Sequence, residues 1–432
     1  MRKTGGRLAT RTALLVSVAT IGLLFQGCGG SDEEADGESS SGEEVELVFY
    51  NQSRGQEEAL NQLAAQYTEE TGIVVTVDTP GPADYGTKLQ AKAQSEDMPD
   101  LYSIIDPDQM APYYKAGWAM DLSSEMEGEW GDSFNPAAIE LSTWAEGNNL
   151  GVDAGIYGAH WDFGTYGLLV NTEATGIEAG DPPATMDDLI SALQEQDATF
   201  SVAASLTPSL LQYYASNFMT DEEIDATLGG EQSWETDGWR QAFQLLVDLR
   251  DAGVIANGSL PGGTDDNPVV ERSFFNIQDV AVIMDGSAGI AVASATAPDF
   301  TEFISIGLPA ATDGTMEPRS PARVGRGAAV NPKGEHPDEA LEFLKWLTEP
   351  EQQAVFAAAG MIPTNAELLA AGEVPESVAG YADLADGSQV VLSAFSTDVR
   401  DAISAGAQSI VLGEKTIDEV LSEVQDAQDL TS

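Results

Sequence analysis

The feature that most constrains the fold is a regular alternation of strand and helix patterns after residue 44. Residues 44–50 place apolar side chains at alternate positions, which is typical of a half-buried strand. Apolar residues at helical spacing follow over 56–71 and stop at Gly72, a residue type common just past a helix end. The expected series continues with strand 73–77, helix 85–96 and strand 101–105. This β-α-β-α-β order predicts a mostly parallel sheet with helices on both faces.

A second unit of the same class is expected beyond residue 160. Thr185 is a helix-capping residue type, and Asp187 and Asp188 follow it where acidic residues stabilise a first turn. The other expected elements are strands 166–170, 200–204, 280–284 and 305–309 and helices 234–252 and 337–347. With 432 residues, the chain has room for two or three folding units.

The amino terminus has the pattern of a secretory signal. Residues 1–11 are basic, and the apolar run over 12–25 is short for a membrane span. The single cysteine, Cys28, follows the segment Leu-Phe-Gln-Gly, at the place where a bacterial lipoprotein is acylated. We therefore expect a lipoprotein signal peptide at 1–27, a lipid on Cys28, a flexible acidic tether at 28–44 and an extracellular protein held at the membrane. The alternative is an ordinary signal peptide with an incidental cysteine, since the Phe and Gln depart from the usual pattern.

The charge balance excludes several classes of partner. The chain has 18 Lys and Arg against 72 Asp and Glu, and four of the basic residues lie within the first eleven positions. Such a surface repels phosphate backbones, so nucleic-acid binding is not expected. Solubility in a salty medium explains the acids more simply than a cation store. With two histidines and one cysteine, the chain lacks a ligand set for structural zinc, and no cofactor is expected.

Several segments, in order along the chain, resemble the extracellular solute-binding proteins of ABC importers, of the maltose-binding (periplasmic binding protein type II) kind. The segments are YTEETGI (67–73), MPDL (98–101), YKAG (114–117), YG (157–158), WD (161–162), GLLVN (167–171), PATMDDL (183–189), VAVIMDG (280–286), HPDEALEFLKWL (336–347), MIPTN (361–365) and TIDE (416–419). Each segment is weak evidence alone, but their order over nearly the whole chain makes the resemblance specific.

The resemblance implies two Rossmann-like α/β lobes with mostly parallel sheets, joined by a hinge of several strands. The expected N-terminal lobe is 45–160 plus about 308–328, and the expected C-terminal lobe is 161–307 plus about 329–432. It further implies a monomer that closes on a small molecule between the lobes, delivers it to the transmembrane subunits of an ABC permease and performs no catalysis. The crossings between lobes are expected near 161–166, 305–309 and 325–331.

Candidate ligand-binding residues lie where strands of the expected sheets end and at the expected hinge. Sugar recognition needs aromatic faces together with charged or amide groups, and Trp161 with Asp162 supply one of each; the alternative is a buried hinge tryptophan. Arg54 resembles a family position that reaches into the cleft, and its alternative is a surface charge. The expected residues are Gln52, Ser53, Arg54, Tyr85, Asp106, Trp161, Asp162, Thr207, Ser209, Asp285 and Arg326.

Two departures from the family leave the solute open. Ser287 and Ser396 stand near positions where sugar-binding members carry tryptophans, which argues against a long maltodextrin. Asp285, Arg323 and Arg326 are candidates to replace those stacking platforms with charge-assisted contacts, although the arginines equally suit acidic neighbours at the hinge. A carbohydrate is the expected solute. The alternatives are a polyamine, a peptide or a metal chelate, and an extracellular glycosidase, for which carboxylate pairs arise by chance in so acidic a chain.

Overall fold

The computed structural model describes residues 45–52, 55–81, 84–104, 107–257, 259, 267–372, 374–385, 387–389 and 391–431. The expected signal peptide 1–27, the tether 28–44 with Cys28, and the site candidates Ser53, Arg54 and Asp106 lie outside the described residues. Among the described residues, no helix is both long enough and apolar enough to cross a membrane.

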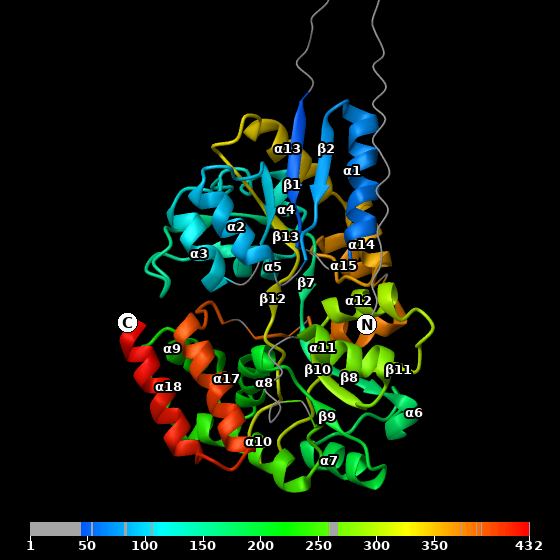
Figure 1. The fold of residues 1–432 in the computed structure, drawn as a ribbon, viewed down its shortest axis with the longest axis vertical. Coiled ribbons are helices and arrows are strands. Elements are labelled where there is room, and N and C mark those ends of the chain that lie inside the picture. Colours follow the sequence, from blue (N-terminus) through cyan, green and yellow to red (C-terminus); the bar gives the residue numbers. More distant parts are fainter. Residues whose placement is uncertain are drawn as a thin grey trace, which may run out of the picture. The chain divides into compact units, whose positions relative to one another are not determined.

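The first sheet has five strands in the order β2-β1-β3-β13-β6. Figure 1 labels β1, β2 and β13 of this sheet. Its strands are β1 (Glu46–Tyr50), β2 (Val74–Asp78), β3 (Leu101–Ser103), β13 (Gly327–Val330) and β6 (Ala159–His160). The strands β2 and β3 pair with β1 in parallel, and helices α1 (Glu57–Thr71) and α2 (Tyr85–Gln94) connect them. The predicted β-α-β-α-β series is therefore confirmed. Gly72 ends α1 in the left-handed conformation, with φ of 79°.

A continuous apolar core fixes the helices on this first sheet. Leu47 and Phe49 point inward from β1, and Leu60 and Leu63 meet them from α1. Helix α13 (Pro337–Leu347) packs on β13 and adds its own apolar face to the same core. A large apolar area removed from water holds these segments together although they are far apart in sequence.

The second sheet has four strands in the order β11-β8-β10-β9. They are β11 (Phe303–Ile306), β8 (Tyr166–Asn171), β10 (Val282–Gly286) and β9 (Phe200–Ser201). Strand β8 runs antiparallel to both β11 and β10, and only the β9–β10 pair is parallel. In the first sheet β13 is likewise antiparallel to β3 and β6. Both sheets are therefore mixed rather than mostly parallel, because β8 and β13 enter from the other half of the chain and not through a β-α-β crossover.

Helices surround the second sheet and bury a second core. The predicted cap of α7 is present as a capping box, in which Thr185 and Asp188 satisfy each other's backbone N–H groups. The helices are α6 (Thr172–Thr175), α7 (Met186–Glu195), α8 (Thr207–Ala215), α9 (Asp221–Leu228), α10 (Asp237–Ala252), α11 (Asn267–Arg272), α12 (Ala288–Thr296), α16 (Glu376–Asp383), α17 (Thr397–Val411) and α18 (Ile417–Thr431).

Two short strands carry the chain between the sheets, and a third passage follows α14 (Pro350–Ala358), which packs in the first core, before α16 packs on β11. Strand β7 (Phe163–Gly164) follows β6 of the first sheet and precedes β8 of the second, and β12 (Arg323–Val324) pairs with it antiparallel before the chain enters β13. The expected crossing near 161–166 is thus present. The crossing expected near 325–331 is also present, where the chain passes from β12 to β13. The one expected at 305–309 is not, because β11 pairs along β8 inside the second sheet.

The segments after residue 307 differ from the expected lobe boundaries. Leu308 donates its N–H to Tyr213 Oη in the second core, at 3.1 Å, and Ala311 N–H is bonded to Asn217. Residues 327–347, by contrast, form β13 and α13 on the first sheet. Hydrogen bonding thus assigns 308–322 to the second sheet, and apolar packing assigns 327–347 to the first. The sequence pattern alone did not reveal this exchange.

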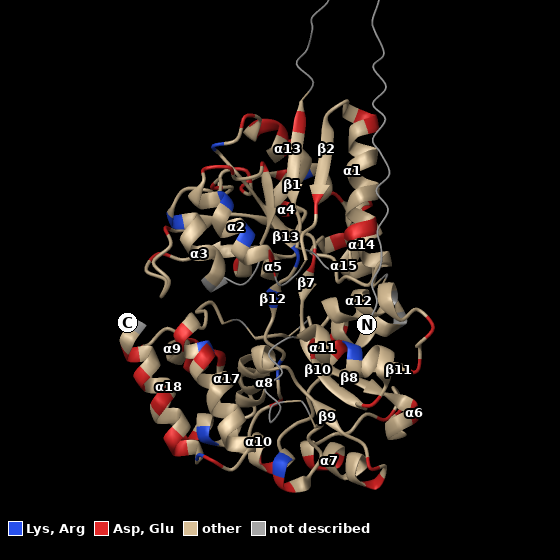
Figure 2. Ribbon diagram, viewed as in Figure 1, with Lys and Arg blue, Asp and Glu red and all other residues tan. Residues whose placement is uncertain are grey.

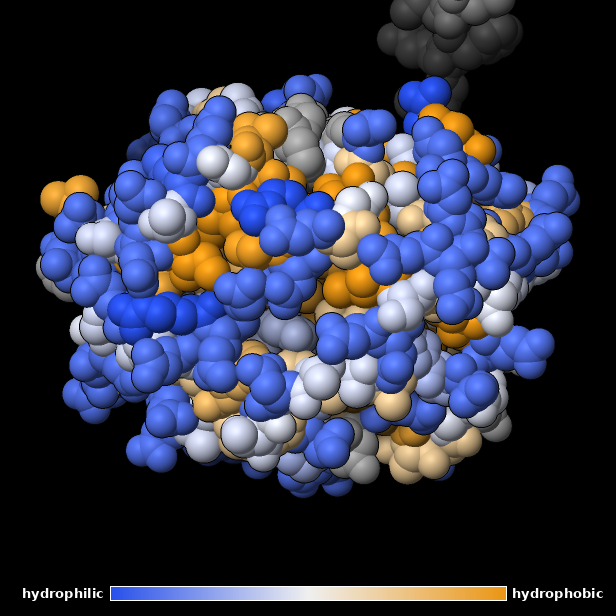
Figure 3. Space-filling view, turned by 90° about the horizontal axis from the view of Figure 1, so that it is seen from below, coloured by the Kyte–Doolittle hydropathy of each residue, from blue (hydrophilic) through white to orange (hydrophobic). Residues whose placement is uncertain are grey.

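Acidic residues are distributed over helices on both sheets (Figure 2). Helix α18 carries acids and no basic residue. The face shown in Figure 3 is mostly hydrophilic, with hydrophobic residues visible in patches between the polar ones. This distribution fits the expectation that the acids keep the surface hydrated.

Candidate ligand-binding cleft

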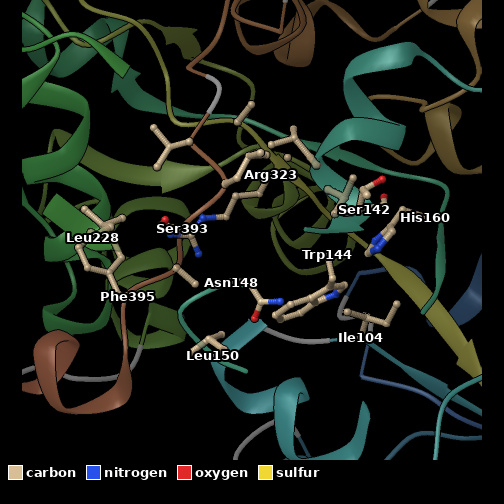
Figure 4. Close-up of a pocket in the computed structure, with 18 of the residues that line it drawn as sticks. Ile104, Ser142, Trp144, Asn148, Leu150, His160, Leu228, Arg323, Ser393 and Phe395 are labelled. Carbon is tan, nitrogen blue, oxygen red and sulfur yellow. The ribbon is translucent and has the colours of Figure 1, made fainter. Parts of the chain in front are cut away.

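A cavity of about 590 Å³ is lined by residues from the first sheet, the second sheet and the strands between them (Figure 4). Its size lies within the range of about 300–1,000 Å³ that is typical of small-molecule sites. Gln52 follows β1 of the first sheet, Tyr166 begins β8 of the second, and Arg323 lies on β12 between them. The fold therefore places a ligand-sized space where both halves of the chain contribute side chains.

An aromatic group lines the cavity on the side of the first sheet. Trp144 lies on β4 (Thr143–Trp144), which pairs with β5 (Gly155–Ile156) in a small hairpin. The ring of Tyr114 meets Trp144 edge-on at 5.7 Å and stacks on Tyr157 at 5.1 Å. All three line the cavity, and Figure 4 shows the Trp144 indole near Ile104 and Asn148. Aromatic faces held rigidly in this way are what the apolar side of a sugar ring requires.

Asp162 and Arg326 form the polar part of the cavity at the crossing strands. The Asp162 side chain is 1% exposed, and its Oδ2 accepts a hydrogen bond of 3.4 Å from Arg326 N–H. Burial raises the pKa of Asp162 to about 6, although the Arg326 charge and N–H donors oppose the rise. Among the described residues, neither Asp162 Oδ1 nor Arg326 Nε has a hydrogen-bond partner. A buried acceptor and a buried donor beside a cavity are suited to the hydroxyl groups of a ligand.

A glycine permits the close approach of the two crossing strands. A Cβ on Gly325 would lie 2.5 Å from Asp162 Oδ2, which is closer than real contacts allow. On the other side of the strand, His160 Nδ1 lies 3.2 Å from Gly325 O. Burial lowers the pKa of His160 to about 4, so the ring is neutral at physiological pH.

Two further arginines lie at the second-sheet side of the cavity. Arg323 donates to Ser209 Oγ at 3.2 Å and lies over the Tyr166 ring, 5.3 Å from its centroid. Arg400 of α17 lies 5.8 Å from the centroid of Phe395. Three arginines thus line one cavity in a chain with 18 basic residues.

Of the described candidates, Gln52, Asp162 and Arg326 line the cavity, whereas two aromatic candidates lie elsewhere. Trp161 is fully buried in the first core, where it stacks on Phe356 at 5.3 Å and donates to Gln56 Oε1 at 2.9 Å. This is the position of a buried hinge tryptophan. Tyr85 is also buried, and its hydroxyl donates to Ser103 O at 2.6 Å.

Three polar candidates are engaged inside the second half and are not among the lining residues. Thr207 donates to Ala203 O, and Ser209 accepts from Arg323, so both act within or behind the cavity wall. Asp285 accepts from Asn267 Nδ2 at 3.0 Å and from the next backbone N–H. Ser209 therefore orients a lining arginine, and Asp285 holds the start of the following turn.

Sequence reasoning missed Trp144, Tyr114 and Tyr157. The strand that carries Trp144 has only two residues and gives no periodic signal. Tyr114 belongs to a segment that matched the family, but its burial against Trp144 depends on a hairpin some thirty residues later. Tertiary packing, which leaves no local pattern, brings these rings together.

The sequence profile of the bacterial extracellular solute-binding protein family matches residues 52–354. The chain belongs to this family. Its members are non-catalytic solute-binding proteins. Within the described part of the chain, no three His, Cys, Asp or Glu side chains gather as metal ligands would.

Individual relatives are distant. A maltooligosaccharide ABC transporter solute-binding lipoprotein of Streptococcus pneumoniae is 31% identical over 106 residues, which is 24% of this chain and 23% of that protein. A Thermotoga lettingae ABC transporter solute-binding protein bound with α-D-tagatose has a TM-score of 0.73 at 17% identity, covering 90% of this chain and 100% of that one. The maltotriose-bound MalE domain of Bdellovibrio bacteriovorus has a TM-score of 0.69 at 18% identity, covering 89% and 99%. The structural matches establish the periplasmic binding protein fold.

Proposed function

We propose that this family member captures a carbohydrate between its two halves and delivers it to the permease of an ABC importer, while a lipid on Cys28 holds it at the membrane. One observation supports the sugar assignment. The aromatic residues Trp144, Tyr114 and Tyr157 line the same cavity as the polar residues Asp162 and Arg326. A sugar ring offers an apolar face to an aromatic ring and hydroxyl groups to charged or amide partners. The relatives whose names mention sugars support the same class of ligand.

In the proposed complex, aromatic and polar side chains make different contacts with the sugar. Trp144 supplies the stacking surface, and Gln52, Asp162 and Arg326 supply hydrogen bonds. The cavity volume of about 590 Å³ suits a mono- or oligosaccharide of a few rings. Halves that each hold part of the ligand are stabilised in the closed arrangement when it binds.

A thermal-shift panel tests the ligand class. Mono- and oligosaccharides, sugar acids, polyamines and short peptides are each added to the protein, and a ligand at 100 times its dissociation constant stabilises the fold by about 2.7 kcal/mol. We expect a shift with at least one saccharide and none with the other classes. A shift with a polyamine or peptide, and with no sugar, would overturn the carbohydrate assignment.

Paired tryptophan variants test the site itself. Trp144→Ala is expected to weaken binding of the identified sugar by about tenfold or more, since an aromatic contact contributes roughly 0.5–1.5 kcal/mol beyond its buried area. Trp161→Phe is the matched control, because Trp161 lies in the core: it lowers the melting temperature and leaves the affinity within about twofold. Isothermal titration and thermal unfolding measure the two effects separately. An unchanged affinity in Trp144→Ala would remove Trp144 from the site.

A further inference from the structure

One side chain from the first half of the chain hydrogen-bonds to the second half at the wall of the cavity. Asn149 lies in the loop between β4 and β5, and its Nδ2 donates to Ala394 O at 2.8 Å and to Leu228 O at 3.3 Å. Leu228 belongs to the core of the second sheet, and Ala394 precedes Phe395 of that same core. All three residues also line the cavity.

The donor is presented by a loop with its own internal bonds. Asn148 Nδ2 donates to Ala145 O and Val152 O, at 2.8 and 2.7 Å, and its Oδ1 accepts from Val152 N–H. Lys115 Nζ donates to Leu150 O at 2.9 Å and ties the loop to α3 (Pro107–Lys115). The loop therefore holds Asn149 in place and does not need to order when the contact forms.

The two acceptors are held together as well. Leu228 is the last residue of α9, where carbonyl groups lack partners within the helix. Asp225, one turn earlier, accepts from Leu392 N–H and Ser393 N–H, both at 2.7 Å, and so fixes the segment that carries Ala394 beside the end of α9. One amide group thus meets two carbonyl oxygens that the second half has already positioned.

We infer that Asn149 is a latch that favours the closed arrangement of the cleft before any solute binds and slows the release of a bound solute. Within the described part of the chain, the Asn149 amide hydrogen-bonds only to backbone carbonyls of the opposite half, so the contact is independent of the ligand's chemistry. Its effect on release rests on the proposed binding function, whereas its effect on the empty protein does not.

Small-angle scattering of the ligand-free protein tests the latch directly. We expect Asn149→Ala to increase the radius of gyration, and Asn149→Asp to increase it at least as much, because a carboxylate repels two carbonyl oxygens. Asn61→Ala is the matched control, since that amide donates to Glu57 O within one helix, and it should scatter like the native protein. Scattering curves of both Asn149 variants that match the native curve would overturn the inference.

The release rate of the sugar identified in the thermal panel gives the second readout. Loss of two neutral hydrogen bonds, one of them long, should speed dissociation by about 3- to 30-fold and change association less. An unchanged dissociation rate would show that Asn149 does not slow the release of the sugar. If no sugar binds, the scattering experiment still decides on the latch, and the proposed function fails separately.

Discussion

Asp162 has a buried carboxyl group, and its environment disfavours the charged form that the side chain adopts in water. Its pKa rises from 3.8 to about 6 because the carboxyl is buried, in spite of the Arg326 charge nearby. The folded protein therefore holds this proton more tightly than the unfolded chain does. Stability from this group is fully present below about pH 4 and is lost as the pH rises through about 6.

Asp162→Asn should raise the free energy of unfolding at about pH 7.5 by up to about 3 kcal/mol, and have little effect near pH 4. The same variant should bind the sugar more weakly, because an amide replaces a charged acceptor. Thermal unfolding at the two pH values measures the first effect, and titration calorimetry the second.

Asp121 provides a control of opposite sign. Burial alone would raise the pKa of Asp121, but hydrogen bonds from the Ser123 side chain and backbone outweigh it and lower the pKa. Asp121→Asn should therefore destabilise the protein at neutral pH, and its effect should shrink as the pH falls through the folded-state pKa. The same pH dependence in both variants would contradict the assignment of either shift.

Gly325 is required by the close approach of the two crossing strands. Gly325→Ala places a methyl group against Asp162 Oδ2 and the backbone of Asp162, and should cost about 1–3 kcal/mol and weaken ligand binding. Gly180→Ala is the matched control, since a Cβ there has nothing within 4 Å. Denaturant unfolding measures the stability of both variants. Equal stabilities would show that the crossing strands can accommodate a Cβ at position 325.

At the scale of elements, local sequence patterns predicted the helices and strands well, but they did not predict the directions in which the strands pair. The helix over 337–347 was predicted with its exact bounds, because a proline at its start and apolar residues at helical spacing are local signals. Strand β9 is only two residues long where five were expected, since residues 202 and 203 are irregular and a 3-10 helix (Ala204–Leu206) begins ahead of α8. Strand β8 is antiparallel to its neighbours because the chain reaches it from the first sheet. The residues of β8 themselves do not indicate this direction.

The candidate site shows the same division. Asp162 belongs to the WD segment that resembles the family, and Arg326 lies at an expected crossing between the lobes, so the sequence indicated both. Trp144 and Asn149 sit on a short hairpin whose partners are residues 114 and 394. These contacts join residues that are tens to hundreds of positions apart in the sequence. Neither composition nor periodicity predicts contacts between residues so far apart.

The cap of α7 is a local feature with a measurable effect. Thr185→Ala removes the hydroxyl that accepts from Asp188 N–H and keeps the backbone N–H that donates to the Asp188 carboxylate. The loss should cost about 1 kcal/mol of stability, without changing ligand affinity. Thr185→Ser keeps the hydroxyl and should restore most of the loss. Chemical denaturation of the three proteins checks this, and a serine variant as unstable as the alanine variant would contradict it.

For the whole molecule, the formal net charge of −54 is the dominant electrostatic property. Like charges spread over both halves repel one another, and salt shortens the range of that repulsion from about 10 Å at 0.1 M to about 3 Å at 1 M. We expect the melting temperature to rise by several degrees between these NaCl concentrations. Sucrose at equal osmolality is the control for non-ionic effects, and a flat or falling melting temperature in NaCl would show that repulsion does not limit stability.

The thin connection between the sheets has a mechanical consequence. Strands β7 and β12 pair over two residues each, Phe163 with Val324 and Gly164 with Arg323. A ribbon this narrow accepts a large change of twist through a few backbone torsions, and no rung of either broad sheet has to break. We expect any reorientation of one half against the other to be taken up by twist in this ribbon and in the neighbouring connection, where Phe163 N–H donates to Ile362 O at 2.7 Å.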